Sequence, residues 1–115
     1  MSRGVALKDV AEVVRSKNAG PYELTLDVIF KEKEDYEWAR EVCFFTNERV
    51  ANWYRIPVSA ICSVIYFDPA WAVKITLLRP CVSGAVGDTD VYGAQQHAPL
   101  LDICIPLPRF LSQAP

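Results

Sequence analysis

Hydrophobic residues recur along the first third of the chain with two different spacings. Between residues 7 and 14 they stand three or four positions apart, which predicts one face of a short helix ending before Gly20-Pro21. The residues on that face are Leu7, Val10, Ala11 and Val14. From Tyr22 to Phe30 hydrophobic and polar residues alternate, which predicts a strand with one buried face. The segment around Gly20 is therefore expected to join a helix to a strand.

The middle of the chain predicts two helical segments and then two strands. The charged run KEKEDYEWAR opens a helix, and Thr46 is a suitable N-cap for a second helical segment. The run Ala60–Phe67 is almost entirely apolar, which predicts a buried strand. Alternation returns in Trp71–Arg79, and the turn signal Asp68-Pro69-Ala70 between the two strands predicts an antiparallel hairpin.

A loop of roughly twenty residues precedes the last predicted strand, Leu100–Ile105. This order of elements predicts an α+β fold with a mixed four-stranded sheet and helices packed on one face. The strands on either side of the helix pair are expected to run parallel through a right-handed crossover. We expect one compact domain over residues 1–115, with a core at 7–106 and a surface tail at 107–115.

Composition and charge exclude several classes of protein. The chain has 115 residues, 51% hydrophobic and 23% charged, which is typical of a folded domain. A net charge of −2 argues against nucleic-acid binding, which requires a basic face. No apolar run is long enough to span a bilayer and no signal peptide is visible, so a cytoplasmic protein is expected. The four cysteines are far apart, which favours reduced thiols over zinc or disulfides, although Cys81 borders the long loop.

The loop contains the string GDTDVYGAQQHAP, residues 87–99, which gathers most of the candidate chemistry. His97 could exchange a proton near neutral pH, and Asp90 could orient it. Hydrogen bonds to a ligand or partner could come from Asp88, Tyr92, Gln95 and Gln96. The aspartates and the histidine could instead bind a divalent metal, or the polar side chains could only cap their own turns. The glycines match neither phosphate-binding nor dinucleotide motifs, and no cofactor or metal is predicted.

Two cations are candidates for binding an anion. Arg79 continues the parity of the apolar positions in its strand, so its guanidinium could turn inward to bind a carboxylate or phosphate. Alternatively, the strand ends at Leu78 and Arg79 reaches solvent or pairs with Asp88. Lys17 and Asn18 precede the glycine at the expected helix-to-strand junction and are both candidates for contact with a substrate or partner. If Lys17 faces the same rim as the loop, it forms a two-cation site with Arg79; otherwise it complements the end of a helix.

Three strings carry a family resemblance: RSKNAGPYELTLDVIF, YFDPAWAVKITLLRP and GDTDVYGAQQHAPLLDICIP. They resemble a small family of unknown function that occurs beside, or fused to the C-terminal end of, the acyclic terpene utilisation protein AtuA and its relatives. The likeness runs from Leu7 to Pro106. It implies a small subunit of a larger AtuA-like protein that acts on acyl-CoA or small carboxylic acids by hydration or dehydration. It assigns no catalytic residue.

Two hypotheses follow from the loop and the resemblance. In the first, the chain is an accessory subunit of a two-component lyase. Its loop enters the partner, Arg79 and Lys17 bind the substrate anion, and His97 with Asp90 assists proton transfer. In the second, the chain is a non-catalytic binding or structural module that stabilises the larger subunit. An independent enzyme ranks third because the chain has a single histidine and no nucleophile motif. Self-assembly into a homo-oligomer is left open.

Overall fold

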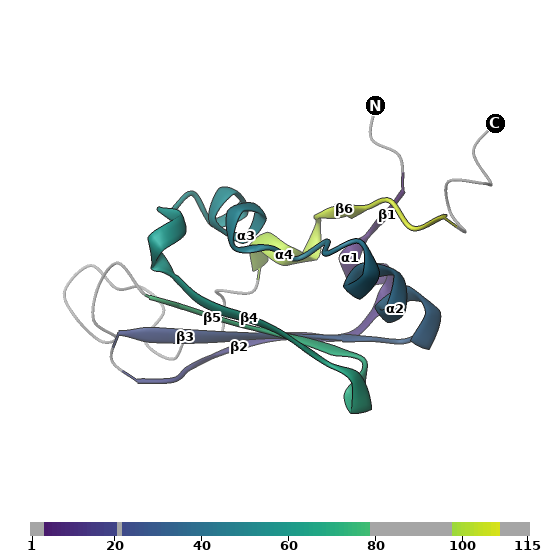
Figure 1. Ribbon diagram of the computed structural model, residues 1–115, viewed down its shortest axis with the longest axis horizontal. Coiled ribbons are helices and arrows are strands. Elements are labelled where there is room, and N and C mark those ends of the chain that lie inside the picture. Colours follow the sequence, from purple (N-terminus) through teal and green to yellow (C-terminus); the bar gives the residue numbers. More distant parts are fainter. Residues whose placement is uncertain (1–3, 21, 79–97, 109–115) are drawn as a thin grey trace.

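The computed structural model describes residues 4–20, 22–78 and 98–108 of the chain (Figure 1). Its helices and strands, in order, are β1 (Val5–Ala6), α1 (Leu7–Val10), β2 (Ala11–Asn18), β3 (Glu23–Phe30), α2 (Lys33–Glu41), α3 (Asn47–Tyr54), β4 (Ile61–Phe67), β5 (Ala72–Leu78), α4 (Ala98–Leu101) and β6 (Cys104–Ile105). Short 3-10 turns at Val58–Ala60 and Asp68–Ala70 precede and follow β4.

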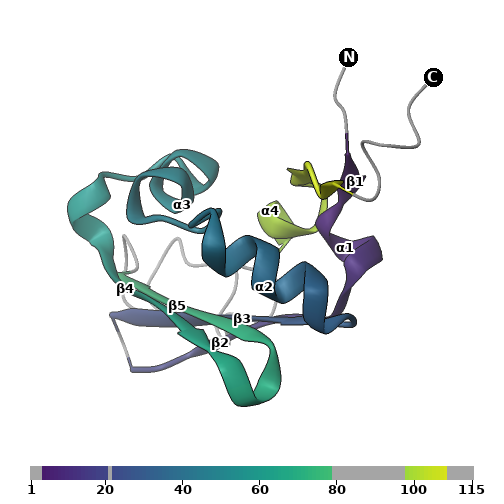
Figure 2. The ribbon, with the colours of Figure 1, turned by 45° about the vertical axis from the view of Figure 1, so that its right-hand side comes forward.

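Four of the strands form one sheet with the order β2-β3-β5-β4, and the helices cover one of its faces (Figures 1 and 2). The α+β class, the four-stranded sheet and the one-sided helix layer are therefore confirmed. Each neighbouring pair is antiparallel, so the sheet is antiparallel where a mixed one was expected. β3 and β4 do run in the same direction, because both are antiparallel to β5, but β5 lies between them. The two strands joined by the helix pair are thus not neighbours.

Two predicted elements were wrong. The helix expected from Leu7 is only the single turn α1, and the chain then continues as β2, which forms a hairpin with β3. Gly20 lies in the turn of that hairpin with φ of 144°, a conformation that side-chain-bearing residues rarely adopt. The strand expected over Leu100–Ile105 is divided between α4 and the two-residue strand β6. β6 pairs antiparallel with β1, outside the main sheet.

The core lies between the helices and the inner face of the sheet. Alternate residues of the two central strands point inward and are buried: Leu24, Leu26, Val28 and Phe30 of β3, and Val73, Ile75 and Leu77 of β5. The helices and the C-terminal segment cover them with a second set of buried residues: Leu7, Val10, Tyr36, Ala39, Val50, Ala51, Leu100, Ile105 and Leu107. Burial of each large apolar side chain contributes about 1.5–3 kcal/mol to folding. The alternation in β3 and β5 thus fixes which face receives the helices.

The connection between α2 and α3 is held by aromatic packing and by one tyrosine. Phe44 and Phe45 pack against each other and against Trp53 of α3, with ring centroids 5.2–5.8 Å apart. The hydroxyl of Tyr66, on β4, accepts a hydrogen bond from the backbone N–H of Phe45 at 3.0 Å and donates one to its carbonyl at 2.8 Å. Thr46 then caps α3 by accepting from the backbone N–H of Arg49, which confirms the predicted N-cap. Tyr66 therefore fastens this connection to the sheet.

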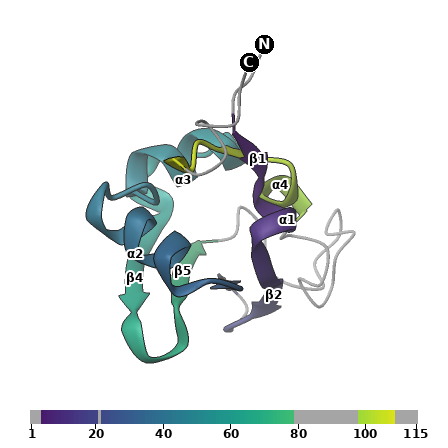
Figure 3. The ribbon, with the colours of Figure 1, turned by 90° about the vertical axis from the view of Figure 1, so that its right-hand side faces the viewer.

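β4 lies at one edge of the main sheet, at the opposite side from β2 (Figure 3). The expectation that this strand is buried was wrong for its outer positions. Ile65 is 51% exposed and Phe67 is 53% exposed. Its continuous apolar run resembles that of a central strand, but only the inner positions, Ile61, Val64 and Tyr66, pack against the core. β4 is therefore an edge strand with an apolar outer surface.

Candidate functional site

The face of the sheet that the helices leave uncovered carries three rows of cross-strand neighbours. Directly opposed residues in antiparallel strands share a face, so the strand register aligns side chains of the same kind across the sheet. The apolar row consists of Val13, Ile29, Ala72 and Phe67; the charged row of Arg15, Asp27, Lys74 and Ile65; the hydroxyl row of Lys17, Thr25, Thr76 and Ser63. We refer to this surface as the open face.

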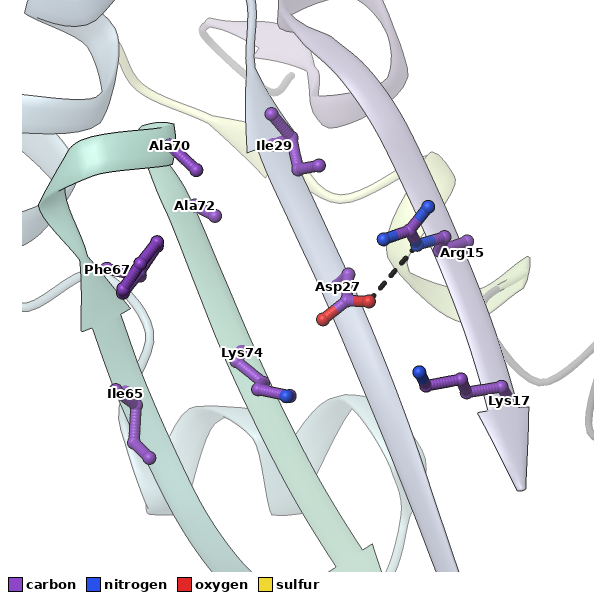
Figure 4. Close-up of a pocket in the computed structure, with 9 residues that line it drawn as sticks. All are labelled: Arg15, Lys17, Asp27, Ile29, Ile65, Phe67, Ala70, Ala72 and Lys74. Carbon is purple, nitrogen blue, oxygen red and sulfur yellow. Dashed lines mark hydrogen bonds and ion pairs between the residues drawn. The ribbon is translucent and has the colours of Figure 1, made fainter. Parts of the chain in front are cut away.

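A concavity of about 320 Å³ lies over the apolar and charged rows (Figure 4). Its volume is at the lower end of the range for small-molecule pockets, which is about 300–1,000 Å³. The residues that line it are Arg15, Lys17, Asp27, Ile29, Ile65, Phe67, Ala70, Ala72 and Lys74. All four strands of the main sheet contribute, so the concavity depends on the sheet as a whole. We call it the open-face concavity.

The electrostatics of the open-face concavity centre on Asp27. The Nε of Arg15 lies 3.1 Å from Oδ2 of Asp27 in an ion pair, and the Asp27 side chain is only 16% exposed whereas that of Arg15 is 61% exposed. Lys74 is directly opposite Asp27 on the other neighbouring strand. Figure 4 shows the ammonium groups of Lys17 and Lys74 turned toward the strand that carries Asp27. Three cations around one carboxylate leave a formal surplus of two positive charges in a chain whose net charge is −2.

This arrangement is suited to binding an anion that also has an apolar part. A guanidinium and two ammonium groups can bind a carboxylate or phosphate, and the adjacent apolar row offers Ile29 and Phe67 to a hydrocarbon group. Among the described residues that line the concavity there is no histidine, cysteine or serine. The lining consists of cationic, carboxylate and apolar side chains.

Lys17 is the one predicted site residue that the structure places in the open-face concavity. Asn18 follows it on β2 but is paired opposite Leu24, an inner-face position, so the two side chains belong to different faces of the strand. The alternative role for Lys17 at a helix end was wrong, because Lys17 lies on a strand. The other candidates lie outside the described residues and stay predictions: Arg79, Asp88, Asp90, Tyr92, Gln95, Gln96 and His97. Cys81 lies outside them as well.

Three charged residues of the site were missed by sequence reasoning. Arg15 fell within the predicted helix, and Asp27 and Lys74 were assigned only to the polar sides of separate strands. Their alternation did indicate the solvent side of β3 and β5. What the sequence did not reveal is the register that places both Arg15 and Lys74 opposite Asp27.

A second cluster of ionisable groups fastens α2 to the turn after β4. The Tyr36 hydroxyl donates to Oδ1 of Asp68, and Nη1 of Arg40 lies 2.9 Å from the same oxygen. Burial, followed by the bond to Asp68, raises the pKa of Tyr36 to about 12. The hydrogen bonds from Tyr36 and Arg40 lower the pKa of the Asp68 carboxyl. Because Tyr36 is buried in the core, this cluster is a structural fastening.

Comparison with known protein families now identifies the chain. The family model described as "Domain of unknown function (DUF4387)" matches residues 7–104. The chain belongs to this family. The match includes β2 through β5, so the open-face concavity lies entirely within the DUF4387 domain. No curated protein and no solved structure matches the chain.

Two further properties bear on the functional class of this DUF4387 protein. No helix in residues 4–20, 22–78 or 98–108 is long and apolar enough to cross a membrane. In the same described ranges, no three His, Cys, Asp or Glu side chains are grouped as they would be around a metal ion.

Proposed function

We propose that this protein is a small accessory subunit of an AtuA-like two-component enzyme. It acts in the cytoplasm, and its open face receives the anionic part of an acyl-CoA or small carboxylic acid substrate during hydration or dehydration. The observation that carries the proposal is the open-face concavity, where three cations surround a single carboxylate beside exposed apolar side chains. The larger partner and the reaction class come from the resemblance of the three sequence strings.

Each part of the open face has a distinct role in this proposal. The Nε of Arg15 donates a hydrogen bond to Asp27, and the guanidinium has further N–H donors with which to bind a carboxylate or phosphate. Lys17 and Lys74 add charge on either side of Asp27 and attract the anion from a distance. The apolar row then contacts the hydrocarbon part of the substrate. Proton transfer stays assigned to His97 and Asp90, and Arg79 stays a further anion-binding candidate.

A non-catalytic module that stabilises the larger subunit is the second candidate. It is favoured by the composition of the open-face concavity, whose described lining provides charge and apolar contact but no histidine, the residue most often used for proton transfer. The exposed Ile65 and Phe67 would then contact protein rather than substrate.

The experiment compares two variants with the same change in charge. The chain is co-expressed with the AtuA-like protein encoded nearest to it, and the complex is assayed with small carboxylates and CoA thioesters. The variant K17Q/K74Q removes two cations of the concavity, whereas the control K8Q/K33Q removes two exposed cations that pair with Asp102 and Glu37 elsewhere. We expect K17Q/K74Q to lower turnover at least tenfold and the control to match the wild type.

The outcomes separate the two candidates. Turnover of K17Q/K74Q that stays low at saturating subunit concentration supports the substrate-binding role. If turnover returns to normal at saturation, the open face is an interface and the second candidate holds. If the wild-type chain neither forms a complex nor changes turnover, the accessory-subunit proposal is overturned.

A further inference from the structure

The two edges of the main sheet are protected to different degrees. An edge strand exposes backbone N–H and C=O groups that can pair with another strand, and proteins usually block such pairing with charges, proline or bulges. β2 carries Glu12, Arg15 and Lys17 and has an irregular register between Ala11 and Val13. β4 has the sequence ICSVIYF, which contains no charge and no proline. Its only register irregularity falls at its start, so Ser63–Phe67 is regular.

The side chains of β4 add to this exposure. Ile65 and Phe67 point to the open face and are each about half exposed. On the backbone side, β5 is the one ladder partner of β4 among the described strands. A regular, uncharged edge with exposed apolar side chains is the kind of surface that pairs with another strand.

We propose that β4 pairs with β4 of a second copy of this chain, joining the two main sheets into one continuous antiparallel sheet. A twofold contact brings the same surface together from both copies, so the surface has to be compatible with itself. β4 meets this requirement because no like charges face each other across the axis. β2 does not, because Arg15 and Lys17 would approach their own copies. The uncharged edge is therefore compatible with its own copy, and we assign a second copy as its occupant.

The pairing extends the open face. A twofold axis that relates two antiparallel edge strands stands perpendicular to the sheet, so both open faces lie on the same side. Ile65 and Phe67 of both copies then form one apolar strip between two groups of cations. The open-face concavity ends at Ile65 and Phe67 in a single chain. The second copy supplies the same two side chains as a further wall, so the site is completed by dimerisation.

The test measures the mass of the purified chain by size exclusion with light scattering, from low to high micromolar concentration. We expect twice the 12.9 kDa chain mass at high concentration. Ile65→Lys places two like charges beside the axis and is expected to weaken dimerisation at least tenfold. The matched control is Val42→Lys, which changes a residue of the same exposure, 50%, just after α2. Far-UV circular dichroism and thermal unfolding check that both variants remain folded.

Each outcome is decisive. A dimer that is lost in Ile65→Lys and kept in Val42→Lys supports pairing through β4. A wild-type chain that is monomeric at high concentration overturns the inference, and so does a dimer that survives Ile65→Lys. Equal weakening by both variants also overturns it, because it shows a general effect of added charge. If the wild-type chain is monomeric alone but Ile65→Lys prevents binding to the AtuA-like protein, the occupant of β4 is that protein. The proposed accessory role does not depend on these results.

Discussion

Replacing Tyr66 with phenylalanine removes one hydroxyl and two hydrogen bonds to the backbone of Phe45. Burial raises the pKa of Tyr66, so the hydroxyl stays protonated and able to donate over the physiological range. Each neutral hydrogen bond contributes about 1 kcal/mol net, and an unsatisfied buried group costs about 1–3 kcal/mol. Phe45 is 2% exposed, so water reaches its backbone poorly once the hydroxyl is gone. We expect Tyr66→Phe to lower the free energy of unfolding by about 2 kcal/mol.

The expected loss corresponds to a measurable shift in melting temperature. Globular proteins unfold with an entropy of about 2.1 cal/mol/K per residue, so a loss of about 2 kcal/mol in a chain of this length lowers Tm by roughly 8 °C. Thermal and urea unfolding followed by circular dichroism measure both quantities. The control is Tyr22→Phe, the same chemical change at a tyrosine that is 59% exposed. A Tyr66→Phe protein within about 0.5 kcal/mol of the wild type, the range of ordinary surface substitutions, would refute the fastening role.

Three other predictions address the fold and the site. Because the pKa of Tyr36 is about 12 instead of the usual 10.0, its contribution to the free energy of unfolding is complete below pH 10 and is lost as the pH rises to about 12. Urea unfolding across this window should show that the free energy of unfolding depends less on pH in Tyr36→Phe than in the wild type. Gly4→Ala should force β1 away from β6 and lower Tm by several degrees, since Gly4 has φ of 116° and an added Cβ would overlap the Ile105 carbonyl. A substitution that leaves Tm unchanged would contradict this packing. Asp27→Asn should tighten binding of a carboxylate several-fold at low salt, because it raises the local surplus of positive charge. Calorimetry at high salt should show that this gain in affinity disappears. Weaker binding by the variant would mean instead that Asp27 positions Arg15.

The sequence predicted the elements whose periodicity is strong and local. Buried and outward residues alternate along β5 and, from Leu26 onward, along β3, and Thr46 caps α3 as its chemistry indicated. β2 was missed because its inner positions include Ser16 and Asn18, so its alternation carries little apolar signal. β4 was assigned to the interior because its outer positions are apolar too. In these two edge strands, the hydrophobicity of a residue therefore does not indicate whether its side chain faces the core.

The candidate site was predicted less well, and the reason is geometric. Lys17 was identified as an anion-binding residue, but the other cations of the concavity, Arg15 and Lys74, are brought into place by the pairing register of the strands. A short stretch of sequence does not reveal that register. The pairing of Asp27 with Arg15 on one side and Lys74 on the other is a property of three strands at once. The polar loop candidates, from Arg79 to His97, lie outside the described residues and await a test by substitution.

The division of β3 and β5 into an inner and an outer set has a consequence for how this fold can diverge. Apart from Thr25, which is buried, substitutions in the three rows of the open face alter charge and shape without entering the core, so specificity can change while the scaffold persists. A deletion of one residue within β3 acts differently. It would turn Asp27 toward the helices and Leu26 and Val28 toward water, because side chains alternate with a period of two. These strands can therefore accept many exchanges of residue but no change of length.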